Sequence, residues 1–320
     1  MKVIIYISNY NSIGGVETFV NNFCKRMNKY FDLTLMFDNA DSFDLLLRAS
    51  NWVDVVKIDK SKVYQCDAFI CATAWGYMPF NHIKAKVVVQ MVHADYTHVI
   101  KNWDFKYIKH NTVTHHVCVG QTVAKAFEVA TPYKSNAVIY NLLDNEIKAV
   151  KKVKNKRLHL VSVTRLSLEK GIKRMIDLAN QIPCDYEWHV WGNGSSGYAQ
   201  QMIKQFPKNM IFHGITTKPY DEIAKADYLV QLSDTEGYCY SVIEALQLCT
   251  PCIITPFNSG QEQIIDKKNG YIVPFDLKNI NFDQIINNIP MVEPYIDKSS
   301  EEDWLKILKH DKRKSKKGNL

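Results

Sequence analysis

The chain has 320 residues, 46% of them hydrophobic, with eight cysteines and a formal net charge of +7. This length exceeds one small core and fits two α/β domains, and the hydrophobic content excludes a disordered chain. No run approaches the ~18 uninterrupted apolar residues of a membrane span, and the first eight residues are too short and lack the cleavage site of a signal sequence. We therefore expect a cytoplasmic protein whose cysteines are reduced core thiols.

The amino-terminal part alternates short apolar runs with helical or loop segments. A buried-type strand at residues 2–8 is followed by the paired glycines Gly14 and Gly15 and by an amphipathic helix at 16–28. Further strand-like runs lie at 32–37, 53–58, 68–73, 86–92 and 116–119, and a helix and a closing strand are expected at 121–127 and 137–144. This alternation is typical of a doubly wound parallel sheet.

Ligands of such sheets bind at the carboxyl ends of the strands. Gly14 and Gly15 follow the first strand, where a glycine-rich turn brings backbone amides to an anion, although paired glycines more often only reverse the chain. His93 comes directly after the run at 86–92, at the end of the expected strand. A histidine at a strand end is more often structural or exposed than functional.

A polar, lysine-rich linker at residues 145–157 separates a first domain at 1–150 from a second at 151–298, with a terminal helix and basic tail at 299–320. The second domain opens with a strand at 158–166, a basic loop and a helix at 172–181. Arg165 and Lys170 lie five residues apart across that loop, so the planar guanidinium of Arg165 and the compact ammonium of Lys170 could together hold one diphosphate. Two solvated surface cations are the alternative.

Two further strands of this domain end in glycine motifs. The run at 187–194 ends in a Gly-x-Gly that includes Gly192, and the run at 210–215 ends with Gly214 and Ile215. As bare glycines these would indicate only turns.

The most informative stretch joins an apolar strand at 227–233 to a helix at 240–248. Glu236 and Gly237 fall where strand turns into helix, and Glu244 lies two turns further in. A helix start presents unpaired N–H groups and partial positive charge, which suit a phosphate or sugar hydroxyls. Taken alone, two glutamates eight residues apart more often reflect a first-turn carboxylate and an exposed helix residue.

The order of these motifs resembles the donor-site region of the family 4 retaining glycosyltransferases. The matching positions are Glu236, Gly237, Glu244, Ala245, Thr250, Pro251, Gly260, Glu262 or Gln263, Asn269 and Gly270. The loop from Arg165 to Gly171 matches the diphosphate-binding loop of that family, except that Thr164 stands where Gly is usual, and Cys249 replaces a helix-ending Gly. The resemblance implies an α/β protein of the glycosyltransferase-B architecture, with two Rossmann-like doubly wound parallel-sheet domains and a donor cleft between them.

The resemblance also implies a metal-independent enzyme without a cofactor. It would move a hexose or N-acetylhexosamine, with retention, from a nucleotide sugar, expected to be UDP-linked, to a glycan or lipid-linked glycan. His93 is implied to face the transferred sugar, Glu236 its hydroxyls and Glu244 the ribose, while Arg165 and Lys170 stabilise the leaving diphosphate. The further positions implied to bind the nucleotide are Gly14, Gly15, Gly192, Gly214, Ile215, Gly237, Tyr238 and Cys239.

Two alternatives stay open: a nucleotide-sugar 2-epimerase on the same fold, and a non-catalytic partner of an active glycosyltransferase. At the chain end, a capping box precedes an amphipathic helix, for which packing on the first domain is favoured over insertion into a membrane. The cations from Lys309 to Lys317 predict contact with an anionic membrane surface. No recognition motif for nucleic acid accompanies them.

Overall fold

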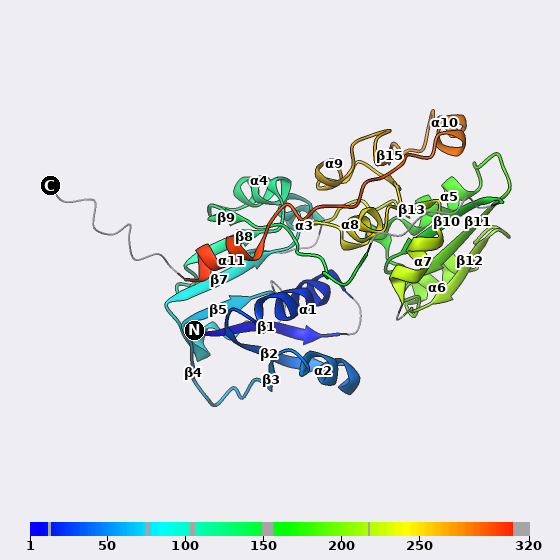
Figure 1. The fold of residues 1–320 in the computed structure, drawn as a ribbon. Coiled ribbons are helices and arrows are strands. Elements are labelled where there is room, and N and C mark those ends of the chain that lie inside the picture. Colours follow the sequence, from blue (N-terminus) through cyan, green and yellow to red (C-terminus); the bar gives the residue numbers. More distant parts are fainter. Residues whose placement is uncertain (12–13, 74–76, 103–105, 149–155, 217, 310–320) are drawn as a thin grey trace. The chain divides into compact units, whose positions relative to one another are not determined.

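The structure is a computed structural model that describes residues 1–11, 14–73, 77–102, 106–148, 156–216 and 218–309. The chain forms two compact units (Figure 1). The first comprises Met1–Asp144 together with Asp297–Leu320, and the second comprises Asn145–Ile296. The division thus falls after Asp144 and again before Asp297. The boundaries expected from the sequence lie after residues 150 and 298.

The first unit is built on a seven-stranded parallel sheet with the order β3-β2-β1-β5-β7-β8-β9. Its strands are β1 (Lys2–Tyr10), β2 (Asp32–Ala40), β3 (Asp54–Lys57), β5 (Ala68–Cys71), β7 (Val87–Val92), β8 (His115–Cys118) and β9 (Ala137–Val138). The short strands β4 (Tyr64–Gln65) and β6 (Ile83–Lys84) pair separately. The helices are α1 (Gly15–Met27), α2 (Phe43–Ala49), α3 (Tyr96–Asn102), α4 (Gln121–Ala130) and α11 (Glu301–Leu308). The central strands are buried on both faces, which explains their continuous apolar runs.

The terminal helix α11, red in Figure 1, belongs to the first unit. Trp304 is fully buried there, and its ring meets Phe23 edge-on with the ring centroids 5.0 Å apart. Arg26 of α1 forms ion pairs with Asp297 and Glu301. The favoured expectation, that this helix packs on the first domain, is confirmed. The basic run beyond Lys309 lies outside the described residues.

The same returning segment explains why the strand expected at 137–144 is short. Only Ala137 and Val138 pair in the sheet. Beyond them the backbone N–H of Tyr140 donates to Ser299 Oγ at 2.9 Å, and that of Leu143 donates to Asp297 Oδ1 at 3.3 Å. Backbone groups that a neighbouring strand would have bound are therefore bound by side chains from the end of the chain.

The second unit contains a six-stranded parallel sheet with the order β12-β11-β10-β13-β14-β15. Its strands are β10 (Leu158–Val163), β11 (Tyr186–Trp191), β12 (Met210–Gly214), β13 (Tyr228–Gln231), β14 (Cys252–Ile254) and β15 (Gly270–Ile272). The helices are α5 (Ile172–Ala179), α6 (Gly197–Ile203), α7 (Pro219–Lys225), α8 (Tyr240–Gln247), α9 (Gly260–Gln263) and α10 (Phe282–Asn287). The α/β class and both doubly wound parallel sheets are as expected from the sequence.

The strand order of the second unit reverses direction between the neighbours β10 and β13. A crevice opens outside the carboxyl ends of strands at such a switch point, because the two following connections leave toward opposite faces of the sheet. The connection after β10 carries Arg165 and Lys170, and the connection after β13 carries Glu236. The fold therefore brings the loops of three candidate residues to one place in the second unit.

Candidate functional site

The two loops at the switch point meet through Gly171. This residue follows a short 3₁₀ helix, Leu168–Lys170, and has a left-handed backbone with φ of 69°. A Cβ atom on Gly171 would lie 1.9 Å from the carbonyl oxygen of Leu232. Only glycine therefore lets the loop that carries Lys170 approach the loop that carries Glu236 so closely.

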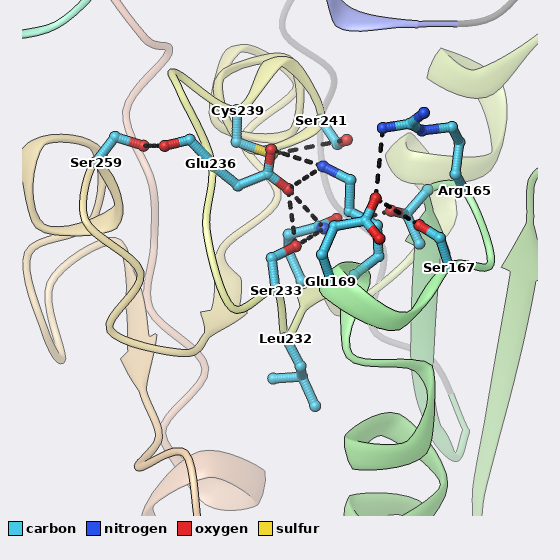
Figure 2. A network of polar contacts seen from close by, with 12 residues as sticks. Arg165, Ser167, Glu169, Leu232, Ser233, Glu236, Cys239, Ser241 and Ser259 are labelled. Carbon is cyan, nitrogen blue, oxygen red and sulfur yellow. Dashed lines mark hydrogen bonds and ion pairs between the residues drawn. The ribbon is translucent and has the colours of Figure 1, made fainter. Parts of the chain in front are cut away.

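Glu236 lies at the centre of the polar network in Figure 2. Lys170 Nζ donates to its two carboxylate oxygens at 2.7 and 2.8 Å. Ser233 Oγ donates to Glu236 Oε1 at 2.7 Å, and Gln231 Nε2 donates to the same oxygen at 3.2 Å. The Lys170 and Glu236 side chains are only 16% and 11% exposed, so this ion pair is largely shielded from solvent screening.

The charge of Lys170 depends on this pair. Burial acts to lower the pKa of the Lys170 ammonium, but the nearby Glu236 carboxylate outweighs it, so the pKa is raised above its usual range. Lys170 is therefore a cation throughout the physiological pH range. A buried cation of this kind is suited to an anionic ligand that takes the place of its carboxylate partner.

Arg165 differs from Lys170 in its surroundings. Its side chain is 58% exposed, and its guanidinium lies 3.5 Å from Glu169 Oε1, which also accepts a hydrogen bond from Ser167 Oγ at 2.7 Å. The positive charge of Arg165 is close enough to act against the charge of Lys170. The structure thus pairs Lys170 with Glu236 and leaves the exposed Arg165 with a longer contact to Glu169.

The helix after the Glu236 loop begins at Tyr240, as expected from the sequence. Gly237 thus lies in the loop, and Cys239 is the residue before the first turn of α8. The Cys239 backbone N–H donates to Gln263 Oε1 at 3.2 Å, and Gln263 Nε2 donates back to the Cys239 carbonyl at 2.8 Å. Gln263, one of the motif positions, therefore braces the end of the loop, and nucleotide binding by Gly237, Tyr238 and Cys239 stays a prediction.

Glu244 is not the exposed helix residue of the alternative interpretation. It is 7% exposed on α8, and Tyr220 of α7 donates a long hydrogen bond of 3.5 Å to its Oε1. A buried carboxylate beside a phenol can bind a hydroxyl group such as one of a ribose.

The glycines after β11 and β12 lie together. The Gly192 N–H donates to the Gly214 carbonyl at 2.7 Å, and Gly192 has no room for a Cβ atom, which would lie 1.8 Å from the Thr164 carbonyl. Ile215 next to them is 55% exposed. Next to these glycines in the chain, the rings of Trp191 and His213 are stacked with their centroids 4.4 Å apart. The sequence did not predict this aromatic pair, because the two residues come from different strands.

In the first unit, Gly14 precedes α1 and Gly15 opens it. The Gly14 carbonyl accepts the Thr18 N–H at 3.0 Å, and a Cβ atom on Gly14 would lie 2.0 Å from Glu17 Oε2. Gly14 therefore leaves room for the Glu17 carboxylate at the start of α1.

His93 follows β7 in the same unit. Its Nε2 is buried and has no hydrogen-bond partner among the described residues. Its ring contacts Phe19 with the centroids 4.8 Å apart, and burial lowers its pKa to about 4. His93 is thus a neutral imidazole with one unsatisfied nitrogen, an arrangement that costs stability unless a ligand completes it.

The described ranges bring together no group of three or more histidine, cysteine, aspartate or glutamate side chains that could hold a metal ion. The expectation of a reaction without metal stays a prediction. Over the same residues, none of the helices has both the length and the apolarity needed to cross a membrane. None of the eight cysteines, all of which lie within the described ranges, forms a disulfide bond.

Comparison with known proteins gives matches to both the sequence and the fold. Residues 144–289 match the model of a family described as glycosyl transferases group 1. The poly(ribitol-phosphate) alpha-N-acetylglucosaminyltransferase of Staphylococcus aureus (strain COL) is 27% identical over 170 residues, which are 46% of this chain and 34% of that protein. The match thus covers about a third of the length of this curated relative.

Among solved structures, HepE from Anabaena in complex with UDP and glucose superposes with a TM-score of 0.70 at 16% identity, covering 90% of this chain and 92% of that one. TarM, a Staphylococcus aureus protein also solved with UDP, superposes with a TM-score of 0.59 at 20% identity, covering 75% and 55%. These likenesses show the shared fold, which is the glycosyltransferase-B architecture expected from the sequence. A donor cleft between the two units stays a prediction.

Proposed function

We propose, from the match of residues 144–289 to the glycosyl transferases group 1 family, that this chain transfers a sugar from a nucleotide donor. The donor is a UDP-linked hexose or N-acetylhexosamine, and the acceptor is a glycan or a lipid-linked glycan. Support for the donor class comes from the matched N-acetylglucosaminyltransferase and from HepE, which was solved with UDP-glucose.

The observation that carries the proposal is the buried pair of Lys170 and Glu236 at the switch point. Each side chain is the other's charged partner, and a nucleotide sugar offers a partner to both: its diphosphate to Lys170 and its sugar hydroxyls to Glu236. A ligand that carries both groups can therefore separate the ion pair without leaving a buried charge unpaired.

During transfer, the bond between the anomeric carbon and the diphosphate oxygen breaks, and its electron pair goes to the diphosphate. The acceptor oxygen forms the new bond to the anomeric carbon on the same face, and its proton passes to the departing diphosphate. Negative charge grows on the leaving group, where Lys170 and Arg165 stabilise it. The two cations act in place of a metal, so we expect activity to survive an excess of EDTA.

Other candidate residues have separate roles in this proposal. Glu244 binds the ribose beside Tyr220, and the backbone at Gly192, Gly214 and Ile215 borders the base. His93 uses its unsatisfied Nε2 to bind a hydroxyl of the transferred sugar, which is supported by the burial of that atom. In the same unit, Gly14 and Gly15 border the diphosphate and the acceptor.

We further propose that the enzyme works in the cytoplasm and that the cations from Lys309 to Lys317 attract it to an anionic membrane surface. Trp304 takes no part in this attachment, because it is buried in the first unit. Sedimentation with anionic liposomes should be weaker, and less sensitive to salt, for a chain that ends at His310.

A thermal-shift panel of nucleotide sugars tests the function directly. A bound donor at ~100 times its dissociation constant adds roughly 2.7 kcal/mol to the free energy of unfolding. We expect this for a UDP-sugar, with smaller shifts for GDP- and ADP-sugars, both with and without EDTA. No shift with any nucleotide sugar would contradict the proposal, and release of UDP with a 2-epimeric sugar in the absence of acceptor would identify an epimerase instead.

A further inference from the structure

Gln231 is a buried polar residue beside the site that the proposed function does not use. It is the last residue of β13 and is 1% exposed. Its Nε2 lies 2.6 Å from Ser233 Oγ, 3.2 Å from Glu236 Oε1 and 3.4 Å from Thr164 Oγ1. A primary amide buried at the end of a central strand costs desolvation free energy, so its contacts identify what it does there.

These contacts form a chain of hydrogen bonds that runs from Gln231 through Ser233 to one oxygen of Glu236. A serine hydroxyl has a single hydrogen, and Ser233 donates that hydrogen to Glu236 Oε1 at 2.7 Å. The short contact between Gln231 Nε2 and Ser233 Oγ must then run from amide to hydroxyl. Gln231 thereby fixes the direction in which Ser233 donates, and it also donates to Glu236 itself.

The two carboxylate oxygens of Glu236 are consequently unequal. Oε1 accepts from Lys170, Ser233 and Gln231. Oε2 accepts from Lys170 alone among the described residues, at 2.8 Å. When Lys170 turns to a diphosphate, Oε1 keeps two protein donors, whereas Oε2 loses its single one.

We propose that Gln231 is a positioning residue that holds Glu236 so that Oε1 is bound by the protein and Oε2 is left to accept a hydroxyl of the donor sugar, an inference that rests on the proposed function. The backbone of the loop has separate supports. Thr255 Oγ1 donates to the Ser233 carbonyl at 2.6 Å, and the Ser259 hydroxyl contacts the Glu236 carbonyl at 3.5 Å. Loss of the Gln231 amide therefore changes the carboxylate without releasing the loop.

The test compares the affinity of the full chain for UDP and for UDP-glucose or UDP-N-acetylglucosamine, whichever the wild type binds more tightly, by isothermal titration calorimetry. Gln231→Leu removes the amide at similar volume. We expect it to weaken binding of the UDP-sugar about tenfold, the loss of one hydrogen bond to a charged group, and to change the affinity for UDP less than twofold. Gln247→Leu is the matched control, because among the described residues its amide donates only to the Ile147 carbonyl, at 3.2 Å, and it should leave both affinities unchanged.

Gln231→Glu gives a second readout that a purely structural role would not produce. At low pH the introduced carboxyl group is protonated, and its single hydrogen can replace one of the two that the amide donates, to Ser233 or to Glu236. As the pH rises it ionises beside Glu236, and two carboxylates repel each other. The ratio of UDP-sugar to UDP affinity should therefore fall with rising pH in this variant and stay flat in the wild type.

The outcomes distinguish failure of the proposed function from failure of the positioning role of Gln231. A wild type that binds neither UDP-sugar nor UDP overturns the proposed function together with the inference. A wild type that binds both, with Gln231→Leu weakening UDP and UDP-sugar equally or neither, overturns only the positioning role. Should Gln231→Leu unfold, which calorimetric melting detects, the Gln231→Glu series decides alone, and a flat affinity ratio in it refutes the inference.

Discussion

Lys170 Nζ lies within 2.8 Å of both carboxylate oxygens of Glu236, although 66 residues separate them in the chain. The pair exists because β10 and β13 are neighbours at the switch point and because Gly171 lets their loops touch. Each residue neutralises a charge that burial would otherwise make costly.

The ion pair should make stability depend on pH at the alkaline end. The pKa of Lys170 is raised in the folded chain, so the stabilisation is complete below the ordinary lysine pKa of ~10.4 and is lost as the pH rises through the folded value. Lys170→Met should remove this part of the alkaline slope. Urea unfolding between pH 8 and 11 measures it, with Lys173→Met, from an exposed pair with Asp177, as the control. Identical slopes for wild type and Lys170→Met would contradict the coupling.

Gly171→Ala should damage both stability and donor binding. The added Cβ would lie 1.9 Å from the Leu232 carbonyl, and a left-handed alanine costs about 1–2 kcal/mol even without a clash. The loop must shift, which moves Lys170 away from Glu236. Gly197→Ala is the matched control, because among the described residues its added Cβ at the start of α6 has no atom within 4 Å apart from its chain neighbours and its own helix backbone. A Gly171→Ala protein that melts and binds UDP like the wild type would show that the loops need no glycine.

His93→Leu should make the protein more stable than the wild type at acidic pH and should reduce its transfer activity. Burial lowers the pKa of His93 to about 4, so between the ordinary value of ~6.5 and 4 the unfolded chain binds a proton that the folded chain does not. The free energy of unfolding of the wild type should therefore fall with falling pH, by up to about 3 kcal/mol from this residue. The leucine variant should gain on the wild type from pH 7 to pH 4 while losing transfer activity. His116, whose pKa is lowered in the same way, contributes equally to both proteins, so parallel pH curves would refute the prediction.

Cys249→Gly should stabilise the protein without affecting donor affinity. Cys249 follows α8 with φ of 57°, in the left-handed region that glycine adopts without strain. Relief of this strain is worth about 1 kcal/mol, or a rise of a few degrees in melting temperature. Cys252→Gly, in the buried strand β14, should instead destabilise. A lower melting temperature for Cys249→Gly would show that the thiol has a structural role that outweighs the backbone strain.

Much of this architecture could be predicted from the sequence, because parallel strands buried on both faces are long apolar runs that stand out between polar turns. The loop residues Arg165, Lys170 and Glu236 could be placed at strand ends for the same reason. The pairing of Lys170 with Glu236 depends on the order of the strands, which local patterns do not determine. The positions of Gln231 and Ser233 around the carboxylate depend on it too.

Other differences arise where distant segments replace local structure. The strand expected at 137–144 stops at Val138 because Asp297 and Ser299 bind the following backbone, more than 150 residues away in the chain. The burial of Trp304 against Phe19 and Phe23 instead confirms the favoured expectation that the terminal helix packs on the first domain. Both outcomes depend on the return of the chain end to the first unit.

In the proposed function, Lys170 releases Glu236 to bind a diphosphate. Isothermal titration of UDP and UMP into the wild type and Lys170→Ala, all in EDTA, tests it most directly. We predict that Lys170→Ala weakens binding of UDP about a hundredfold, the cost of one lost contact to an anion of about 3 kcal/mol, with a much smaller effect on UMP, which lacks the second phosphate. UDP binding of equal strength in both proteins would contradict the account.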